Sequence, residues 1–212
     1  MLGATTLTVR VTTLLVTEPC ELETITSNVS PLFALVVAGG IVAWRDHQRS
    51  ERLAQSARYA GALNLVREGK EADAVKVFTA VAGEGGGYAR LASFEEAALL
   101  AKSGDREAAA AAYDRIAAAS EFDPDLRGLA MLLSVLQRMP EADPQATIDR
   151  LAPLTASGSP WRPSAIELTA LARLKLQDKA GALDLFKSLA DDPATPQSLR
   201  TRAAEMATAL AS

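Results

Sequence analysis

The chain has one cysteine and one histidine. A single cysteine excludes an intrachain disulfide, and so small a supply of these ligands excludes a zinc site built from several of them. A nucleophilic device of the Ser-His-Asp or Cys-His type could use only His47, which lies beside an apolar run. We therefore expect a protein that is not an enzyme, with no catalytic residue, no metal ligand and no cofactor.

Aromatic residues are also scarce, and positive charge is not in excess. Aromatic residues make up 5% of the 212 residues, and 22 Lys and Arg face 26 Asp and Glu, for a net charge of −4. Nucleic-acid binding needs a basic stripe, so we expect no nucleic-acid partner and, without a cofactor motif, no small-molecule substrate. Hydrophobic residues still reach 49%, which is typical of a globular domain. Such a core must be built mostly from Ala, Leu and Val, which suits closely packed helices.

Residues 25–44 carry no charge and end in a strongly apolar run that closes with Trp44. A helix of this length, at about 1.5 Å per residue, reaches about 30 Å, the thickness of a bilayer's hydrocarbon core. Trp44 suits the membrane interface, and the arginines that follow suit the headgroup zone. We predict a transmembrane helix over residues 25–44. The alternative is a buried helix of the globular domain.

The segment before this span, residues 1–24, is rich in Thr and β-branched residues and is a poor match to a secretory signal. We predict a disordered tail. Arg10 is the only basic residue in it, whereas Arg45, Arg49 and Arg52 follow the span. By the positive-inside rule, this asymmetry favours a cytoplasmic C-terminal domain.

Residues 45–212 show apolar positions at helical spacing throughout, and no alternating strand pattern. Asp123-Pro124 and Asp143-Pro144 each resemble a helix N-cap followed by proline at the first helical position. Ser159-Pro160 and Thr195-Pro196 repeat that pattern. The glycine-rich stretch 83–87 is expected to be a loop, and it lacks the Lys-Ser/Thr ending of a phosphate-binding loop.

An internal repeat runs through this helical region. Large residues recur at separations of 35, 38 and 35, namely at Phe78, Tyr113, Leu151 and Phe186. Small residues precede them in both helices of three copies, at Ala62 and Ala74, Ala97 and Ala109, and Ala170 and Ala182. This period is close to the roughly 34 residues of tetratricopeptide repeats. We predict an all-α solenoid of tetratricopeptide-like hairpins over 45–212, closed by a capping helix at 195–210. The alternative is a non-repeating helical bundle.

The membrane helix that ends in Trp44, the basic linker from Arg45 to Arg52 and the Ala-rich hairpins together resemble a bacterial family over about residues 31–212. This family includes the ancillary subunit of the SecYEG translocon and, as a relative, the repeat domain of the cell division coordinator, in their alphaproteobacterial form. The resemblance implies a single-pass inner-membrane protein with a periplasmic repeat domain. It also implies association with SecYEG and periplasmic chaperones. The arginines after the span argue for the opposite topology.

We therefore predict a membrane-anchored protein-binding scaffold, because a stacked array presents a face that can hold a peptide or a helix. Arg58, Arg90 and Arg173 are candidate contacts to acidic partner groups, and Trp161 is a candidate anchor. The alternatives are intrachain ion pairs or a solvated face for the arginines, and a plug between two hairpins for Trp161. As a whole, the chain could instead be a self-associating structural protein without clients. The helices expected to line the binding face cover residues 52–67, 89–102 and 164–177.

Overall fold

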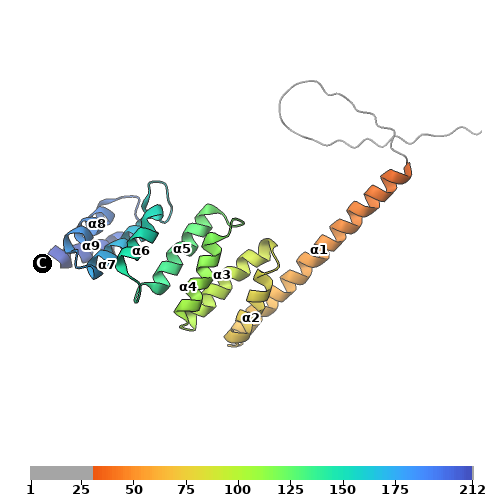
Figure 1. Cartoon of the computed structure of the whole chain (residues 1–212), viewed down its shortest axis with the longest axis horizontal. Coiled ribbons are helices and arrows are strands. Elements are labelled where there is room, and N and C mark those ends of the chain that lie inside the picture. Colours follow the sequence, from red (N-terminus) through yellow and green to blue (C-terminus); the bar gives the residue numbers. More distant parts are fainter. Residues whose placement is uncertain (1–30, 212) are drawn as a thin grey trace, which may run out of the picture. The chain divides into compact units, whose positions relative to one another are not determined.

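The computed structural model describes residues 31–211. The predicted tail and residues 25–30 of the predicted span lie outside them. The first helix, α1 (Pro31–Arg67), contains the boundary between two structural units, residues 1–54 and 55–212 (Figure 1). Among the helices of residues 31–211, none combines the length and the hydropathy that a membrane crossing requires.

From residue 55 onward the described chain is a succession of helical hairpins, which Figure 1 shows in sequence order. Hairpin 1 pairs α1 with the next helix, hairpins 2 to 4 follow, and a last helix closes the array. The helices after α1 are α2 (Glu71–Ala82), α3 (Gly86–Lys102), α4 (Arg106–Ala118), α5 (Pro124–Arg138), α6 (Pro144–Leu151), α7 (Arg162–Lys175), α8 (Lys179–Asp191) and α9 (Gln197–Ala211). A 3-10 turn, η1 (Ala152–Thr155), extends α6.

The repeat predicted from the sequence is confirmed by the packing. The four large residues Phe78, Tyr113, Leu151 and Phe186 are all buried. The six paired alanines are fully buried as well, at Ala62, Ala74, Ala97, Ala109, Ala170 and Ala182. Each alanine lets the two helices of a hairpin approach closely, and each large side chain fills the space between that hairpin and the next.

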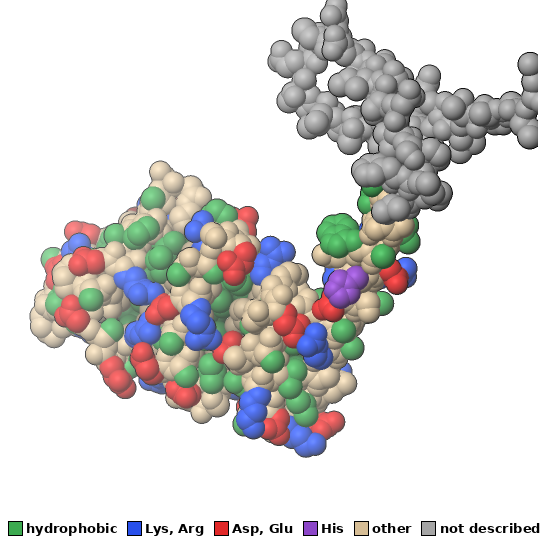
Figure 2. Space-filling view, turned by 45° about the vertical axis from the view of Figure 1, so that its right-hand side comes forward, with side chains coloured by type: hydrophobic (Ala, Val, Ile, Leu, Met, Phe, Trp, Pro, Cys, Tyr) green, Lys and Arg blue, Asp and Glu red, His purple; other side chains and the backbone are tan. Residues whose placement is uncertain are grey.

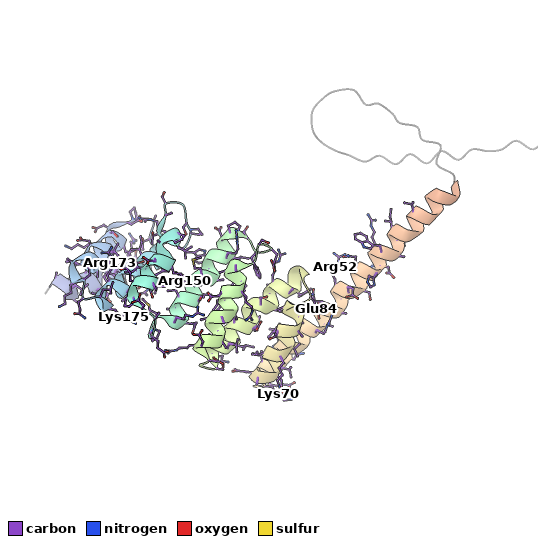
Figure 3. The ribbon with its side chains drawn as sticks, in the orientation of Figure 1. Arg52, Lys70, Glu84, Arg150, Arg173 and Lys175 are labelled. Atoms are coloured by element: carbon purple, nitrogen blue, oxygen red, sulfur yellow. The ribbon has the colours of Figure 1, made fainter. Side chains whose placement is uncertain are left out.

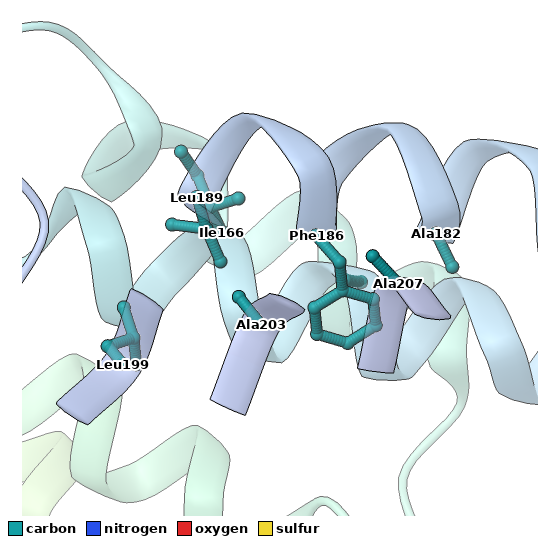
Figure 4. Close-up of a cluster of buried hydrophobic side chains, with 8 residues drawn as sticks. Ile166, Ala182, Phe186, Leu189, Leu199, Ala203 and Ala207 are labelled. Atoms are coloured by element: carbon teal, nitrogen blue, oxygen red, sulfur yellow. The ribbon is translucent and has the colours of Figure 1, made fainter. Parts of the chain in front are cut away.

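The last hairpin illustrates how the stacking works (Figure 4). Phe186 of α8 lies among side chains of α7 and of α9, including Ile166 and Ala203. A hairpin without its neighbour would expose this surface to water, so adjacent units stabilise one another. The helix α9 covers the final apolar face, as predicted for a cap.

Aspartates begin most of the second helices and the third hairpin. Their carboxylates accept hydrogen bonds from backbone N–H groups of the first turn, at Asp105, Asp123, Asp143 and Asp178. The prediction for Ser159-Pro160 was wrong, because α7 begins at Arg162 with Trp161 in the N-cap position. Thr195 also caps nothing: its side chain is buried, and its hydroxyl has no hydrogen-bond partner among the described residues.

Hairpin 3 departs from the other three. Its second helix α6 is short, and α5 packs extensively on α4 but only sparsely on α6. Its buried cluster is built from Val135, Leu151, Leu154 and side chains of α7, and the half-buried indole of Trp161 lies against Gly128 of α5. The third hairpin is therefore splayed, and contacts from α7 and α4 hold its helices in place.

Candidate protein-binding face

The first helix of each hairpin has one side turned away from the second helices. On α3 the buried residues include Ala89, Ala92 and Ala97, which lie on the packed side. Leu91 and Ala98 are seven residues apart, so they share one face of the helix, and both are exposed. Leu91 is 52% exposed. We call this side of the first helices the open face.

The next first helix, α5, continues the pattern. Leu129 and Leu136 are also seven residues apart, opposite the buried Ser134, and Leu136 is 48% exposed. Ala97 of α3 and Ala130 of α5 belong to one core, in which both helices pack on α4. Leu91 and Leu136 are therefore exposed on the first helices of hairpins 2 and 3. Neither α5 as a lining helix nor the exposure of these leucines was predicted from the sequence.

The predicted arginines Arg58 and Arg90 have partners within the chain. Arg58 forms a 2.6 Å salt bridge with Glu84 in the loop after α2. Glu84 is labelled in Figure 3. Arg90 donates to the backbone oxygen of Glu121, in the loop after α4, at 3.2 Å. Each arginine therefore connects the first helix of a hairpin to the loop that leaves the same hairpin.

In hairpins 3 and 4 the first helix is also bonded to the loop that leaves the hairpin, but by different pairs of residue types. The indole Nε1 of Trp161, after η1, donates to the backbone oxygen of Asp125 on α5 at 2.7 Å. In hairpin 4, Arg162 lies 3.4 Å from Asp192, in the loop after α8. We call these four contacts the loop ties. Arg162 was not predicted from the sequence, although its place at the start of a first helix is the signal that could have identified it.

Arg173 lies elsewhere, at the turn between α7 and α8 (Figure 3). Its guanidinium lies 2.7 Å from Asp178, and its Nε is buried without a partner among the described residues. A backbone hydrogen bond from Gly181 and the charge-assisted bond from Arg173 lower the pKa of Asp178. The structure therefore does not bring Arg173 together with Arg58 and Arg90. A role of these residues in partner binding stays a prediction.

A second set of contacts, the turn ties, joins neighbouring hairpins. Lys102 at the end of α3 reaches Glu71 at the start of α2, at 2.6 Å. Arg138 at the end of α5 lies 3.3 Å from Glu107 of α4. Lys175, labelled in Figure 3, donates to the backbone oxygens of Met139 and Pro140 at the end of α5. Each partner lies about one repeat earlier in the sequence, a spacing that could have pointed to these contacts.

Two polar contacts also lie on first helices. The hydroxyl of Tyr59 lies 3.5 Å from Glu95, and burial together with this carboxylate raises the pKa of Tyr59. Arg202 of α9 makes two hydrogen bonds to Glu167 of α7. On the side of the molecule that is visible in Figure 2, Lys and Arg side chains are intermixed with Asp and Glu side chains. Within residues 31–211, no cluster of three His, Cys, Asp or Glu side chains could hold a metal ion.

This architecture agrees with the comparisons to known proteins. The profile of the tetratricopeptide repeat-like domain family matches residues 26–157, more than half of the chain. The chain belongs to this family. Repeats of this kind are typically non-enzymatic scaffolds for protein–protein interaction. No curated protein matches the sequence.

A solved structure shares the fold. It is the crystal structure of a Podosopora anserina protein with nearly identical TPR-like repeats of kinesin light chain type. The TM-score is 0.52 at 15% identity, over 73% of this chain and 83% of the other. At that identity, the similarity is one of fold alone.

Proposed function

We propose that this protein is a membrane-anchored scaffold that binds other proteins on its open face. The stacked array of hairpins is the observation that carries the proposal, because such an array presents side chains from several consecutive helices to one partner. The loop ties hold each exit loop against the first helix of its own hairpin, and the turn ties join neighbouring hairpins. The open face is therefore a preformed surface, and a partner would meet little entropic cost of ordering it.

The anchor in this proposal is the uncharged segment of residues 25–44. In the described part of it, Val37, Ile41 and Val42 are exposed around the start of α1, and Trp44 is 62% exposed. A helix that is apolar on all sides requires an apolar environment. A lipid bilayer would supply one, and Trp44 would lie near its interface.

As partners we propose the Sec translocon and periplasmic chaperones, with the repeat domain in the periplasm of a bacterial inner membrane. The resemblance stated above supports this choice. Arg45, Arg49 and Arg52 oppose it, since they follow the span on the side that would face the periplasm.

The topology is tested by fusing alkaline phosphatase, or a reporter active only in the cytosol, to the C-terminus. We expect phosphatase activity in a membrane fraction that resists carbonate extraction. Activity of the cytosolic reporter would show the opposite orientation, with the repeat domain in the cytoplasm. A fusion protein recovered outside the membrane fraction would contradict the anchor.

Crosslinking in native membranes, followed by mass spectrometry, tests the partners. We expect recovery of translocon subunits. The control is the same experiment on a variant whose chain stops before α3. If the main product is instead a dimer of the chain itself, the protein is a self-associating structural protein without clients.

A further inference from the structure

We propose that Arg45, Arg49 and Arg52 together bind the phosphate groups of anionic phospholipids, on one side of α1 just after the uncharged segment. We call these three residues the arginine stripe. The proposal rests on the membrane anchor of the proposed function and assigns the class of lipid that surrounds it. Four features support it: the shared face of the arginines, their lack of carboxylate partners among the described residues, the exposed apolar side chains beside them, and their reach.

The shared face is the first feature. The three arginines are spaced by four and three residues in α1, so at about 100° per residue they lie within about 60° of one another. On the same helix, Asp46 lies about 60° and Glu51 about 100° from the nearest arginine, so both acidic residues lie outside the stripe. A membrane surface is a plane of charge. Cations on one side of a helix can all meet such a plane at once, whereas the acidic residues are turned away from it.

The second feature is the state of the guanidinium groups. All three arginine side chains are exposed, and none forms an ion pair with a carboxylate within residues 31–211. Arg58, further along α1, is by contrast bonded to Glu84. A phosphate can therefore accept hydrogen bonds from the stripe without breaking an ion pair, and the planar guanidinium matches two of its oxygens. The choline of phosphatidylcholine neutralises its own phosphate, so the uncompensated charge of an anionic phospholipid is the better partner.

The third feature is the apolar surface beside the stripe. Ile41 and Val42 precede Arg45 by four and three residues, which places them on the same side of α1, and they are 47% and 66% exposed. Leu53 follows Arg49 by four residues and is 62% exposed. The stripe therefore continues one apolar surface and borders another apolar side chain. A phospholipid supplies acyl chains for these side chains and a phosphate for the arginines, whereas a soluble phosphate supplies only the charge.

Reach is the fourth feature. From Arg45 to Arg52 the helix advances about 10 Å, and the headgroup layer of each leaflet is about 5–8 Å thick. The side chain of Arg52, labelled in Figure 3, turns back toward the uncharged segment, since its Nε donates to the backbone oxygen of Gln48 at 3.1 Å. A modest tilt of α1 toward the stripe then brings all three guanidinium groups to the phosphates, and tilts of about 20° are usual for helices that cross membranes.

The test measures which lipid surrounds Trp44 in the full chain. Two sets of nanodiscs contain phosphatidylcholine and phosphatidylglycerol in the same ratio. In one set the phosphatidylglycerol carries brominated acyl chains, and in the other an equal amount of the phosphatidylcholine does. Bromine quenches tryptophan fluorescence on contact, and a Trp44→Phe chain gives the background signal of Trp161, the other tryptophan. We expect quenching that corresponds to about threefold or greater enrichment of phosphatidylglycerol, decreasing as salt is added.

Two variants with the same change of net charge identify the residues responsible. Replacing Arg45, Arg49 and Arg52 with Gln should make quenching by the two brominated lipids equal. The control replaces Arg106, Lys179 and Lys187 with Gln, because these side chains are exposed and lie in the repeat domain. The control should keep the enrichment of the parent chain. Replacing the stripe with three lysines should keep most of it, since the charge remains.

Each other outcome overturns the proposal. Equal quenching by the two brominated lipids in the parent chain would exclude the preference and leave the anchor intact. Equal losses in the stripe variant and the control variant would attribute the preference to net charge alone. Photo-crosslinking from position 49 in native membranes to an acidic protein instead of lipid would assign the stripe to a protein partner. No quenching by either lipid would contradict the anchor itself, and this proposal would fail with it.

Discussion

The indole of Trp161 lies against Gly128 so closely that a Cβ at residue 128 would be 2.9 Å from its Cδ1 atom. The same ring donates its Nε1–H to the backbone oxygen of Asp125, one turn earlier on α5. One hydrogen bond and one close packing contact therefore hold the start of α5 against the loop before α7. This loop tie replaces the contact that α5 and α6 lack in the splayed hairpin.

The first prediction concerns that contact. Gly128→Ala should lower the free energy of unfolding by about 1–3 kcal/mol, because the added methyl group collides with Trp161 and with Leu154. Urea denaturation of the full chain, followed by circular dichroism, measures the change. Gly61→Ala is the matched control, since a Cβ at Gly61 meets no atom within 4 Å. That variant should be neutral or slightly stabilising, because alanine favours the helix.

A double variant identifies the collision as the cause. Replacing Trp161 with Leu should itself destabilise the chain, since it removes the hydrogen bond to Asp125 and part of the packing. In the Trp161→Leu background, however, Gly128→Ala should cost much less than it does alone. Additive effects of the two substitutions would contradict the proposed contact.

The second prediction concerns the turn between α7 and α8. Gln177 has a φ of 63°, the only positive φ of a non-glycine residue within residues 31–211, whereas Gly69 and Gly104 occupy the corresponding turns. A side chain in this region costs about 1 kcal/mol relative to glycine. Gln177→Gly should therefore raise the urea midpoint. Gly104→Ala, which places a side chain in the equivalent turn, should lower it by a comparable amount, and an opposite pair of signs would contradict the argument.

These elements also show what the sequence alone could predict. Ala62, Ala74 and Phe78 follow the repeat because every hairpin must solve the same packing problem, so their positions could be predicted from spacing. The loop ties could not, since Arg90 bonds to a backbone oxygen, which no side-chain pattern reveals. Leu91 is equally hidden, because a leucine at helical spacing predicts burial until the neighbouring helices are placed.

The third prediction concerns Asp114 of α4, which accepts hydrogen bonds from Ser134 and Arg138, both at 2.6 Å, and pairs with Arg150. Burial lowers the pKa of Arg138, but its bonds to Asp114 and Glu107 outweigh that effect and raise it. Asp114→Ala leaves two cations and a buried hydroxyl without their common acceptor. The free energy of unfolding should fall by about 2 kcal/mol.

Asp149→Ala provides the control for this network. Asp149 is an exposed carboxylate of α6 that accepts a hydrogen bond from Gln145 on the same helix, at 2.9 Å. Its loss should cost no more than about 0.5 kcal/mol. Equal effects of the two substitutions in urea denaturation would show that Asp114 does not connect α4, α5 and α6.

The last prediction follows from the lowered pKa of Asp178. The backbone N–H of Gly181 is the main cause, and the guanidinium of Arg173 adds to it. A carboxyl group whose pKa is lower in the folded state stabilises the fold above its unfolded pKa, about 3.9, and loses this contribution as the pH falls through its folded pKa.

Asp178→Asn keeps a side chain that can cap the helix but removes the charge. The parent chain should therefore exceed this variant in stability at pH 7, and the difference should shrink below about pH 4. Urea midpoints of both chains between pH 7 and pH 3 measure it. In Arg173→Gln most of the pH dependence should remain, because the larger cause is the backbone bond. A difference between parent and Asp178→Asn that stays constant down to pH 3 would show that the charge of Asp178 contributes nothing to the turn.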